Sequence, residues 1–227
     1  ILIIMLTLML MAIALPSLTI WHIHPVTPLL FVLYLGGVKL AHEARENPAW
    51  TPFGNTRDLD QDDQDSKAKA GALGPLLFSI AILGIICAAA GWLIANTGVQ
   101  LAAQTGMREG VVGLLLTSVA TSLPELVTTV AAVRRGALTM AVGGILGGNT
   151  FDMLFAAFSD VGYQPGSIYH AVGGDQGFMI CLSIVMTAIL ILGLLRRERS
   201  GPANIGLESS ALLLIYLVGI GAVVFAF

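Results

Sequence analysis

Two apolar stretches carry the motifs that decide the fold: residues 110–134 contain Thr121-Ser122-Leu123-Pro124-Glu125, and the next stretch contains Gly147-Gly148-Asn149-Thr150-Phe151-Asp152. Each stretch is long enough to cross a bilayer and carries a carboxylate near its middle. A charged acidic side chain at that depth costs about 2.5 to 3.5 kcal/mol on insertion scales, so its presence points to a function. We expect Glu125 and Asp152 to hold a cation.

The composition is that of a polytopic membrane protein: 56% of the 227 residues are hydrophobic, 11% are charged, and the mean hydropathy is +0.86. A bilayer core about 30 Å thick needs roughly 20 apolar residues per helix. The sequence predicts an all-α membrane protein with about seven transmembrane helices, of which the second is short. The expected spans are residues 1–20, 26–41, 73–97, 110–133, 138–159, 177–195 and 207–227.

A polar interval rich in charged residues, Pro and Gly separates the second span from the third and is expected to be a solvated linker. The predicted organisation is therefore two helices in residues 1–41, a charged loop in 42–72 and five helices in 73–227. Because every Lys and Arg except Arg108 lies on alternate connections, the long loop is predicted to be cytoplasmic and the C-terminus external.

The beginning of the chain predicts two further features. Its first residue is Ile, and no signal-peptide pattern follows, so we expect the chain to begin inside a longer protein. Trp21, His22 and His24 lie between the first two spans and are interpreted as part of an interfacial belt.

The first motif is predicted to present oxygen atoms along one face of a helix. Ser118, Thr121, Ser122 and Glu125 are separated by three or four positions, which aligns them on one side. Pro124 has no N–H to donate and its ring clashes with the carbonyl four residues earlier, so we expect a kink or break. The carbonyl of Ala120 would then be available to an ion.

The second motif repeats this arrangement with different residues. Glycine pairs allow close approach or bending of the backbone, and Asn149 and Asp152 lie three positions apart on one face. A short turn at residues 134–138 makes the two segments antiparallel neighbours, with both acids near mid-membrane. We therefore predict that Glu125 and Asp152 meet across this interface.

Carboxylates, hydroxyls, an amide and carbonyls form a ligand set made only of oxygen, which suits Ca²⁺ and is also acceptable to Na⁺. The set contains no His or Cys, which makes zinc or copper a poor match. We expect protons to compete with the metal, so that acid inhibits binding. No resident cofactor, no enzymatic activity and no nucleic-acid partner are expected.

These residues resemble the cation/calcium exchanger superfamily, whose alpha-repeat reads roughly G-T-S-x-P-E on one helix and G-S-N-x-x-[ND] on the next. The corresponding residues here are Ala120 to Glu125 and Gly147 to Asp152, within an alpha-repeat at 110–160. The resemblance implies an antiporter of ten helices in two inverted halves, each supplying one repeat to a central ion site.

The resemblance also implies roles for individual residues. Thr121, Ser122, Glu125 and Asp152 match ion-ligand positions, Ser118 and Asn149 support them, and Ala120 offers a carbonyl. Gly148 stands where the family usually has Ser, and Ala120 replaces Gly, so stoichiometry and selectivity stay open. Asp152 also resembles the potassium-dependent branch of the superfamily.

A second copy of the first motif is absent from residues 1–109, although inverted-repeat transporters build their site between two repeats. We therefore expect either that an N-terminal half belongs to the same protein or that a second chain completes the site. The predicted function is exchange of Ca²⁺ for Na⁺ or H⁺ in a prokaryotic plasma (inner) membrane. Alternatives within transport are potassium-dependent or Na⁺/H⁺-type exchange.

Other classes of function match the sequence less well. An intramembrane aspartyl protease would need G-x-G-D, and Gly173-Gly174-Asp175 lies at a loop without that spacing. A helix-borne metalloprotease would need H-E-x-x-H, which His22-Ile23-His24 does not provide. An isolated, non-transporting half remains an alternative. The acidic run in the long loop lacks the Gly and terminal Glu of a calcium-binding EF-hand.

Overall fold

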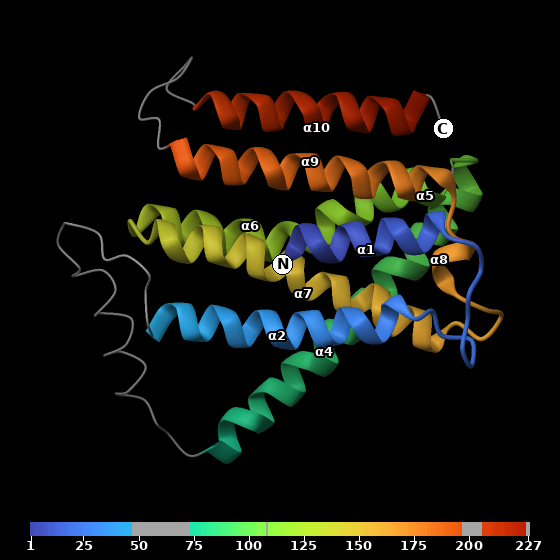
Figure 1. Ribbon diagram of the computed structural model, residues 1–227, viewed down its shortest axis with the longest axis horizontal. Helices are drawn as coiled ribbons and strands as arrows, with labels where there is room; N and C mark the ends of the chain where they lie inside the picture. Colours follow the sequence, from blue (N-terminus) through green and yellow to red (C-terminus); the bar gives the residue numbers. More distant parts are fainter. Residues whose placement is uncertain (47–72, 108, 197–205, 226–227) are drawn as a thin grey trace. The chain divides into compact units, whose positions relative to one another are not determined.

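The computed structural model describes residues 1–46, 73–107, 109–196 and 206–225, and these residues are almost entirely helical (Figure 1). They fall into two compact units: unit 1 comprises Ile1–Arg45 and Ile145–Phe227, and unit 2 comprises Glu46–Gly144. The helices are α1 (Leu2–Ala14), α2 (Val26–Glu46), α4 (Leu73–Thr105), α5 (Glu109–Val112), η1 (Gly113–Thr117), α6 (Ser118–Arg134), α7 (Leu138–Gly162), α8 (Ile168–Ala171), α9 (Gly174–Arg196) and α10 (Leu207–Phe225).

Five helices within the described residues are long and apolar enough to cross a membrane, which confirms the prediction of an all-α membrane protein. These candidate spans are Gly74–Thr105, Leu115–Arg134, Met140–Gly162, Gly174–Leu195 and Leu207–Phe225. Neither α1, which has 13 residues, nor α2 is among them. The expected number of seven spans therefore stays a prediction.

Several helix ends differ from those expected. The helix α1 ends at Ala14 instead of residue 20, because Leu15 precedes Pro16 and adopts an extended conformation with ψ of 156°. The helix α4 continues to Thr105, beyond the expected end at residue 97. The helix α2 continues to Glu46, where we expected the polar loop from residue 42. The remainder of that loop, 47–72, lies outside the described residues.

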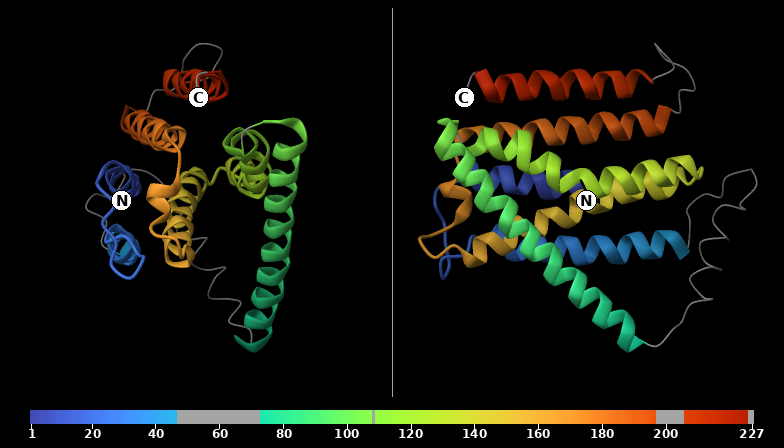
Figure 2. Two further views of the ribbon diagram at one scale, coloured as in Figure 1. Left: turned by 90° about the vertical axis from the view of Figure 1, so that its right-hand side faces the viewer. Right: turned by 180° about the vertical axis from the view of Figure 1, so that it is seen from behind.

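Unit 1 is held together by a core that four helices share. Met5, Met9 and Ala12 of α1 pack with Val26 and Leu30 of α2, Leu154 and Ala157 of α7, and Tyr169 of α8. The helix α9 lies beside both α1 and α10, as the views in Figures 1 and 2 agree. Outward-facing side chains such as Leu192 and Leu217 are apolar and exposed, as expected of helices that face lipid.

Unit 2 packs α4 against α5 and η1, and η1 leads directly into α6. At Gly98 of α4, a Cβ atom would lie 3.2 Å from the Thr117 hydroxyl. Val112, at the end of α5, is almost completely buried. A glycine therefore allows α4 to lie close to the π-helical turn that precedes the first motif.

A tight turn joins α6 to α7. Arg135 caps α6, the N–H of Gly136 donates to the Val133 carbonyl at 3.0 Å, and the N–H of Ala137 donates to the Ala132 carbonyl at 3.0 Å. This pair of hydrogen bonds is the Schellman motif, which places a residue in the left-handed region, and Gly136 has φ of +80°. The short turn predicted at residues 134–138 is confirmed.

Replacement by alanine should have opposite effects on stability at Gly136, in the turn, and at Gly91, within α4. A Cβ on Gly136 would meet nothing within 4 Å, so Gly136→Ala should cost only the backbone penalty of about 1 to 2 kcal/mol. Gly91 of α4 also has open space around it, and Gly91→Ala should stabilise the helix by up to about 1 kcal/mol. Thermal melting of the detergent-solubilised protein measures both. A rise in melting temperature for Gly136→Ala would contradict the assigned turn.

Candidate cation site

The residues of the first motif lie on one face of a continuous helix. The helix α6 begins at Ser118 and contains Thr121, Ser122 and Glu125, which are three, four and seven positions further on. We expected a kink or a break at Pro124, and a break is excluded because α6 runs through this residue. The departure from α geometry lies instead in the π-helical turn Gly113–Thr117, where the N–H of Ser118 donates to the Gly113 carbonyl.

The hydroxyl oxygen of Thr121 on this face is arranged to accept. The hydroxyl of Thr121 donates to the Thr117 carbonyl at 3.0 Å and the Ser118 carbonyl at 3.1 Å. Its proton is therefore directed at the helix, which leaves the lone pairs of Oγ1 to face away from it. The carbonyl of Ala120 has no N–H to receive from Pro124, although the helix continues. Ser118, Ala120, Thr121, Ser122 and Glu125 are all exposed in unit 2.

The second motif is part of α7, which also runs without interruption, through the glycine pairs at 143–144 and 147–148. Asn149 and Asp152 lie on this helix three positions apart and are exposed. The side-chain amide of Asn149 donates to the Ile145 carbonyl at 2.8 Å. Its Oδ1 atom therefore remains available as an acceptor.

The predicted ligands are divided between the two units. Those on α6 belong to unit 2, whereas Asn149 and Asp152 belong to the part of α7 that lies in unit 1. Within each unit the motif residues share one helix. The meeting of Glu125 with Asp152 across the interface stays a prediction.

A cavity of about 360 Å³ in unit 1 adjoins Asn149. Its other polar lining residues are Ser183 and Thr187 of α9, and most of the remaining wall is aliphatic. The hydroxyls of Ser183 and Thr187 donate to carbonyls of their own helix at 2.9 and 2.7 Å. Asn149 therefore borders a space that is large enough to hold water and offers acceptor oxygens.

A polar cluster that the sequence reasoning missed centres on Asp160, which is 0% exposed. Its Oδ2 atom accepts hydrogen bonds from the His24 backbone N–H at 2.8 Å and from the Thr27 hydroxyl at 2.5 Å. Its Oδ1 atom accepts from the Ser167 hydroxyl at 2.7 Å and the Ile168 N–H at 2.9 Å. Four donors satisfy a buried carboxylate, which joins the end of α7 to α8 and the start of α2.

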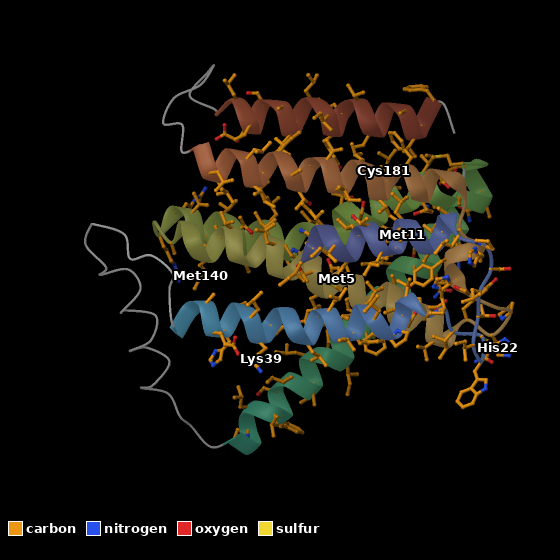
Figure 3. All side chains as sticks on the ribbon, viewed as in Figure 1. Met5, Met11, His22, Lys39, Met140 and Cys181 are labelled. Carbon is orange, nitrogen blue, oxygen red and sulfur yellow. The ribbon has the colours of Figure 1, made fainter. Side chains whose placement is uncertain are left out.

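His24 belongs to this cluster, and its assignment to an interfacial belt was wrong. The side chain is only 3% exposed, whereas Trp21 is 91% exposed. Figure 3 shows His22 in the same connection, at the opposite end of α2 from Lys39. His24 is buried because its backbone is bound to Asp160 and its ring packs edge-on against Tyr169, at 5.6 Å between ring centroids.

The surroundings of the His24 and Tyr169 rings shift the pKa values of both side chains. Burial lowers the pKa of His24, the neighbouring His170 lowers it further, and Asp160 acts in the opposite direction. The Nδ1 atom of His24 accepts a hydrogen bond from the Val26 N–H at 3.2 Å, so the neutral ring carries its proton on Nε2. Burial likewise raises the pKa of Tyr169, whose hydroxyl lies 3.3 Å from that of Thr27.

Comparison with known proteins shows the family to which the chain belongs. Residues 73–225 match the sequence profile described as "Sodium/calcium exchanger protein". The inner membrane protein YrbG of Escherichia coli is 29% identical over 161 residues, covering 70% of this chain and 47% of that protein. The putative antiporter CaxA of Alkalimonas amylolytica is 27% identical over 139 residues, covering 61% of this chain and 42% of that protein.

The sodium/calcium exchanger MaX1 of Methanosarcina acetivorans is 32% identical over 89 residues, which cover 39% of this chain and 25% of that protein. The chain thus spans less than half the length of each of these curated relatives. No solved structure matches it.

The neutral, buried state of His24 predicts a pH-dependent stability. In the unfolded chain a histidine titrates near pH 6.5, whereas the folded chain takes up this proton only at lower pH. Stability is therefore complete above pH 6.5 and falls as the pH drops from there toward the folded pKa. Thermal melting between pH 8 and 5 should show this decline, and His24→Asn, which keeps an acceptor for the Val26 N–H, should reduce it.

His22 is the matched control, because it lies in the same connection and is exposed. His22→Asn should leave the decline unchanged. An equal pH dependence in wild type and His24→Asn would show that this imidazole does not contribute.

Proposed function

Because the chain belongs to the sodium/calcium exchanger protein family, we propose that it carries the cation-binding helices of an antiporter that exchanges Ca²⁺ for Na⁺ or H⁺. The observation that supports this proposal most directly is the oxygen-lined face of α6. Thr121, Ser122 and Glu125 share it, and the Ala120 carbonyl lies beside them without a Pro124 N–H. Hard cations prefer such oxygen ligands.

In the proposed site, Glu125 and Asp152 supply charge and the remaining groups complete the coordination. Thr121 and Ser122 contribute hydroxyl oxygens and Ala120 contributes its carbonyl. Ser118 and Asn149 support the ligands, with Asn149 offering Oδ1 because its amide donates to Ile145. Ca²⁺ is coordinated by six to eight oxygen atoms. The proposed ligands, together with water or oxygens from a second repeat, can supply that number.

Exchange follows from competition for the same oxygens. Two carboxylates together carry a charge of about −2, which one Ca²⁺ or two monovalent cations can neutralise. An empty pair would leave two charges unpaired in a low-dielectric environment, which is costly. The protein therefore favours exposing the site to the other side of the membrane only when the site is occupied. Either kind of ion can occupy the site, but not both at once. This mutual exclusion couples the movement of one cation to that of the other.

The proposed partners are the lipid bilayer, the transported cations and a second set of helices. Since the chain spans less than half of each relative, the complementary repeat is proposed to come from an N-terminal half of the same protein or from another chain. We place the protein in a prokaryotic inner membrane with the long loop cytoplasmic and the C-terminus external. Potassium-dependent exchange is a second candidate, because Asp152 provides a second carboxylate.

Neutralising either acid tests the proposed ligands. Glu125→Gln and Asp152→Asn should each lower Ca²⁺ uptake into vesicles by more than about 100-fold, because loss of a direct ligand should exceed the 10–100-fold effect of an outer-shell partner. Initial rates of radioactive calcium uptake, normalised to the amount of inserted protein, measure this. The full-length protein is used throughout.

Asp175 in the first turn of α9 provides the control, because Asp175→Asn removes an acid outside the proposed site. This variant should transport normally. Uptake at the wild-type rate in Glu125→Gln would remove Glu125 from the site. Replacing Na⁺ by K⁺ or by a proton gradient identifies the counter-ion.

Acid should inhibit Ca²⁺ binding, because a proton and a cation compete for the same carboxylate oxygens. The Ca²⁺ concentration for half-maximal uptake should rise as the pH is lowered from mildly alkaline to acidic values, and saturating Ca²⁺ should restore the rate. A half-saturation concentration that stays constant over this range would contradict competition at the acids.

A further inference from the structure

Three side-chain contacts join the helices α2 and α7, which run antiparallel. Thr27 donates to Asp160, Phe31 stacks edge-on against Phe158 with ring centroids 5.0 Å apart, and Tyr34 contacts Phe151 at 6.0 Å. The partners ascend along α2 at positions 27, 31 and 34, while they descend along α7 at 160, 158 and 151. The spacing of four and three on α2 places its three residues on one face.

These contacts have different strengths and roles. The two aromatic pairs are worth about 0.5 to 1.5 kcal/mol each beyond their buried area, and side chains of this kind can slide or tilt. The Asp160 carboxylate cannot slide in the same way, because its four hydrogen bonds fix it from two sides. Asp160 therefore holds the pair at one end, and the aromatic contacts extend its register along α7.

The contacts between α2 and α7 extend as far as the second motif. Phe151 immediately precedes Asp152 and follows Asn149 by two positions, so the contact of Phe151 with Tyr34 limits the rotation of α7 at this level. A second ring, Phe155, packs edge-on against Phe151 at 5.5 Å and supports it. Rotation or axial shift of α7 would require the Asp160 network and both aromatic contacts to change together.

We propose that the contacts between α2 and α7, held by the buried Asp160 network, position Asp152 for cation binding, with Asp160 and Thr27 as positioning residues. This inference rests on the proposed function, since it assigns these residues a role in the same site. Neither residue touches the ion. A cation site tolerates displacements of only about 0.5 Å before its ligand geometry degrades, so the register of α7 affects affinity directly.

Substitutions in the network should change cation affinity more than maximal rate. Asp160→Asn replaces one acceptor oxygen by an N–H donor, so at least two of the four hydrogen bonds are lost or inverted. Thr27→Val removes a single donor, and Thr27→Ser retains it. We expect the Ca²⁺ concentration for half-maximal uptake to rise roughly ten-fold in Asp160→Asn, less in Thr27→Val, and to be restored in Thr27→Ser.

Thr7 is the matched control, because its hydroxyl donates only to the Ile3 carbonyl of α1, also in unit 1. Thr7→Val should leave half-saturation unchanged. The measurement is calcium uptake by the full-length protein in liposomes as a function of Ca²⁺, with the rate normalised to protein content. A purely structural role would lower protein content or melting temperature and leave half-saturation at the wild-type value.

The outcomes separate the two proposals. Wild-type half-saturation in both Asp160→Asn and Thr27→Val overturns the positioning role, whatever happens to protein content. If Asp160→Asn does not insert, the comparison of Thr27→Val with Thr27→Ser decides. Failure of the wild-type protein to exchange Ca²⁺, or uptake that is independent of Glu125, overturns the proposed function, and the positioning role with it.

Discussion

Lipid offers no hydrogen bonds, and this constraint governs both the fold and the site. Every polar atom on a membrane helix must find its partner within the protein, in water or in an ion. The hydroxyls of Thr121, Ser183 and Thr187 satisfy their protons with carbonyls of their own helices, which leaves acceptor oxygens directed outward. Helices built in this way satisfy their hydroxyl protons in a bilayer and still present acceptor oxygens on their surface.

The helix that carries the first motif combines two departures from regular geometry without breaking. Pro124 removes one hydrogen bond, and the π-helical turn Gly113–Thr117 changes the pairing immediately before α6. Our expectation that the helix would kink or break considered the proline in isolation. A membrane helix tolerates the loss of a single bond when local adjustments satisfy the freed groups, so a continuous helix can still offer the Ala120 carbonyl.

The sequence predicted the features that depend on local chemistry. Hydrophobic length identified α4, α6, α7, α9 and α10, and the short interval at residues 134–138 predicted the turn between α6 and α7. The spacing of Ser118, Thr121, Ser122 and Glu125 predicted a shared helical face. The helix ends depended on single residues that hydropathy averages out, such as Pro16 after α1. The Asp160 cluster could not be predicted, because its hydrogen bonds to His24 and Thr27 join residues more than 130 positions apart.

Asp152 and Asp160 show why residue type alone does not assign a function. Both are acids on α7, eight positions apart. Asp160 is fully buried and its two oxygens each accept two hydrogen bonds from the protein, so it has no capacity left to bind a cation. Asp152 is exposed on its helix, at a position that the family motif assigns to an ion ligand. One helix can therefore hold one carboxylate buried as an anchor and leave another exposed, and the burial of Asp160 depends on the donors that α2 and the start of α8 bring to it.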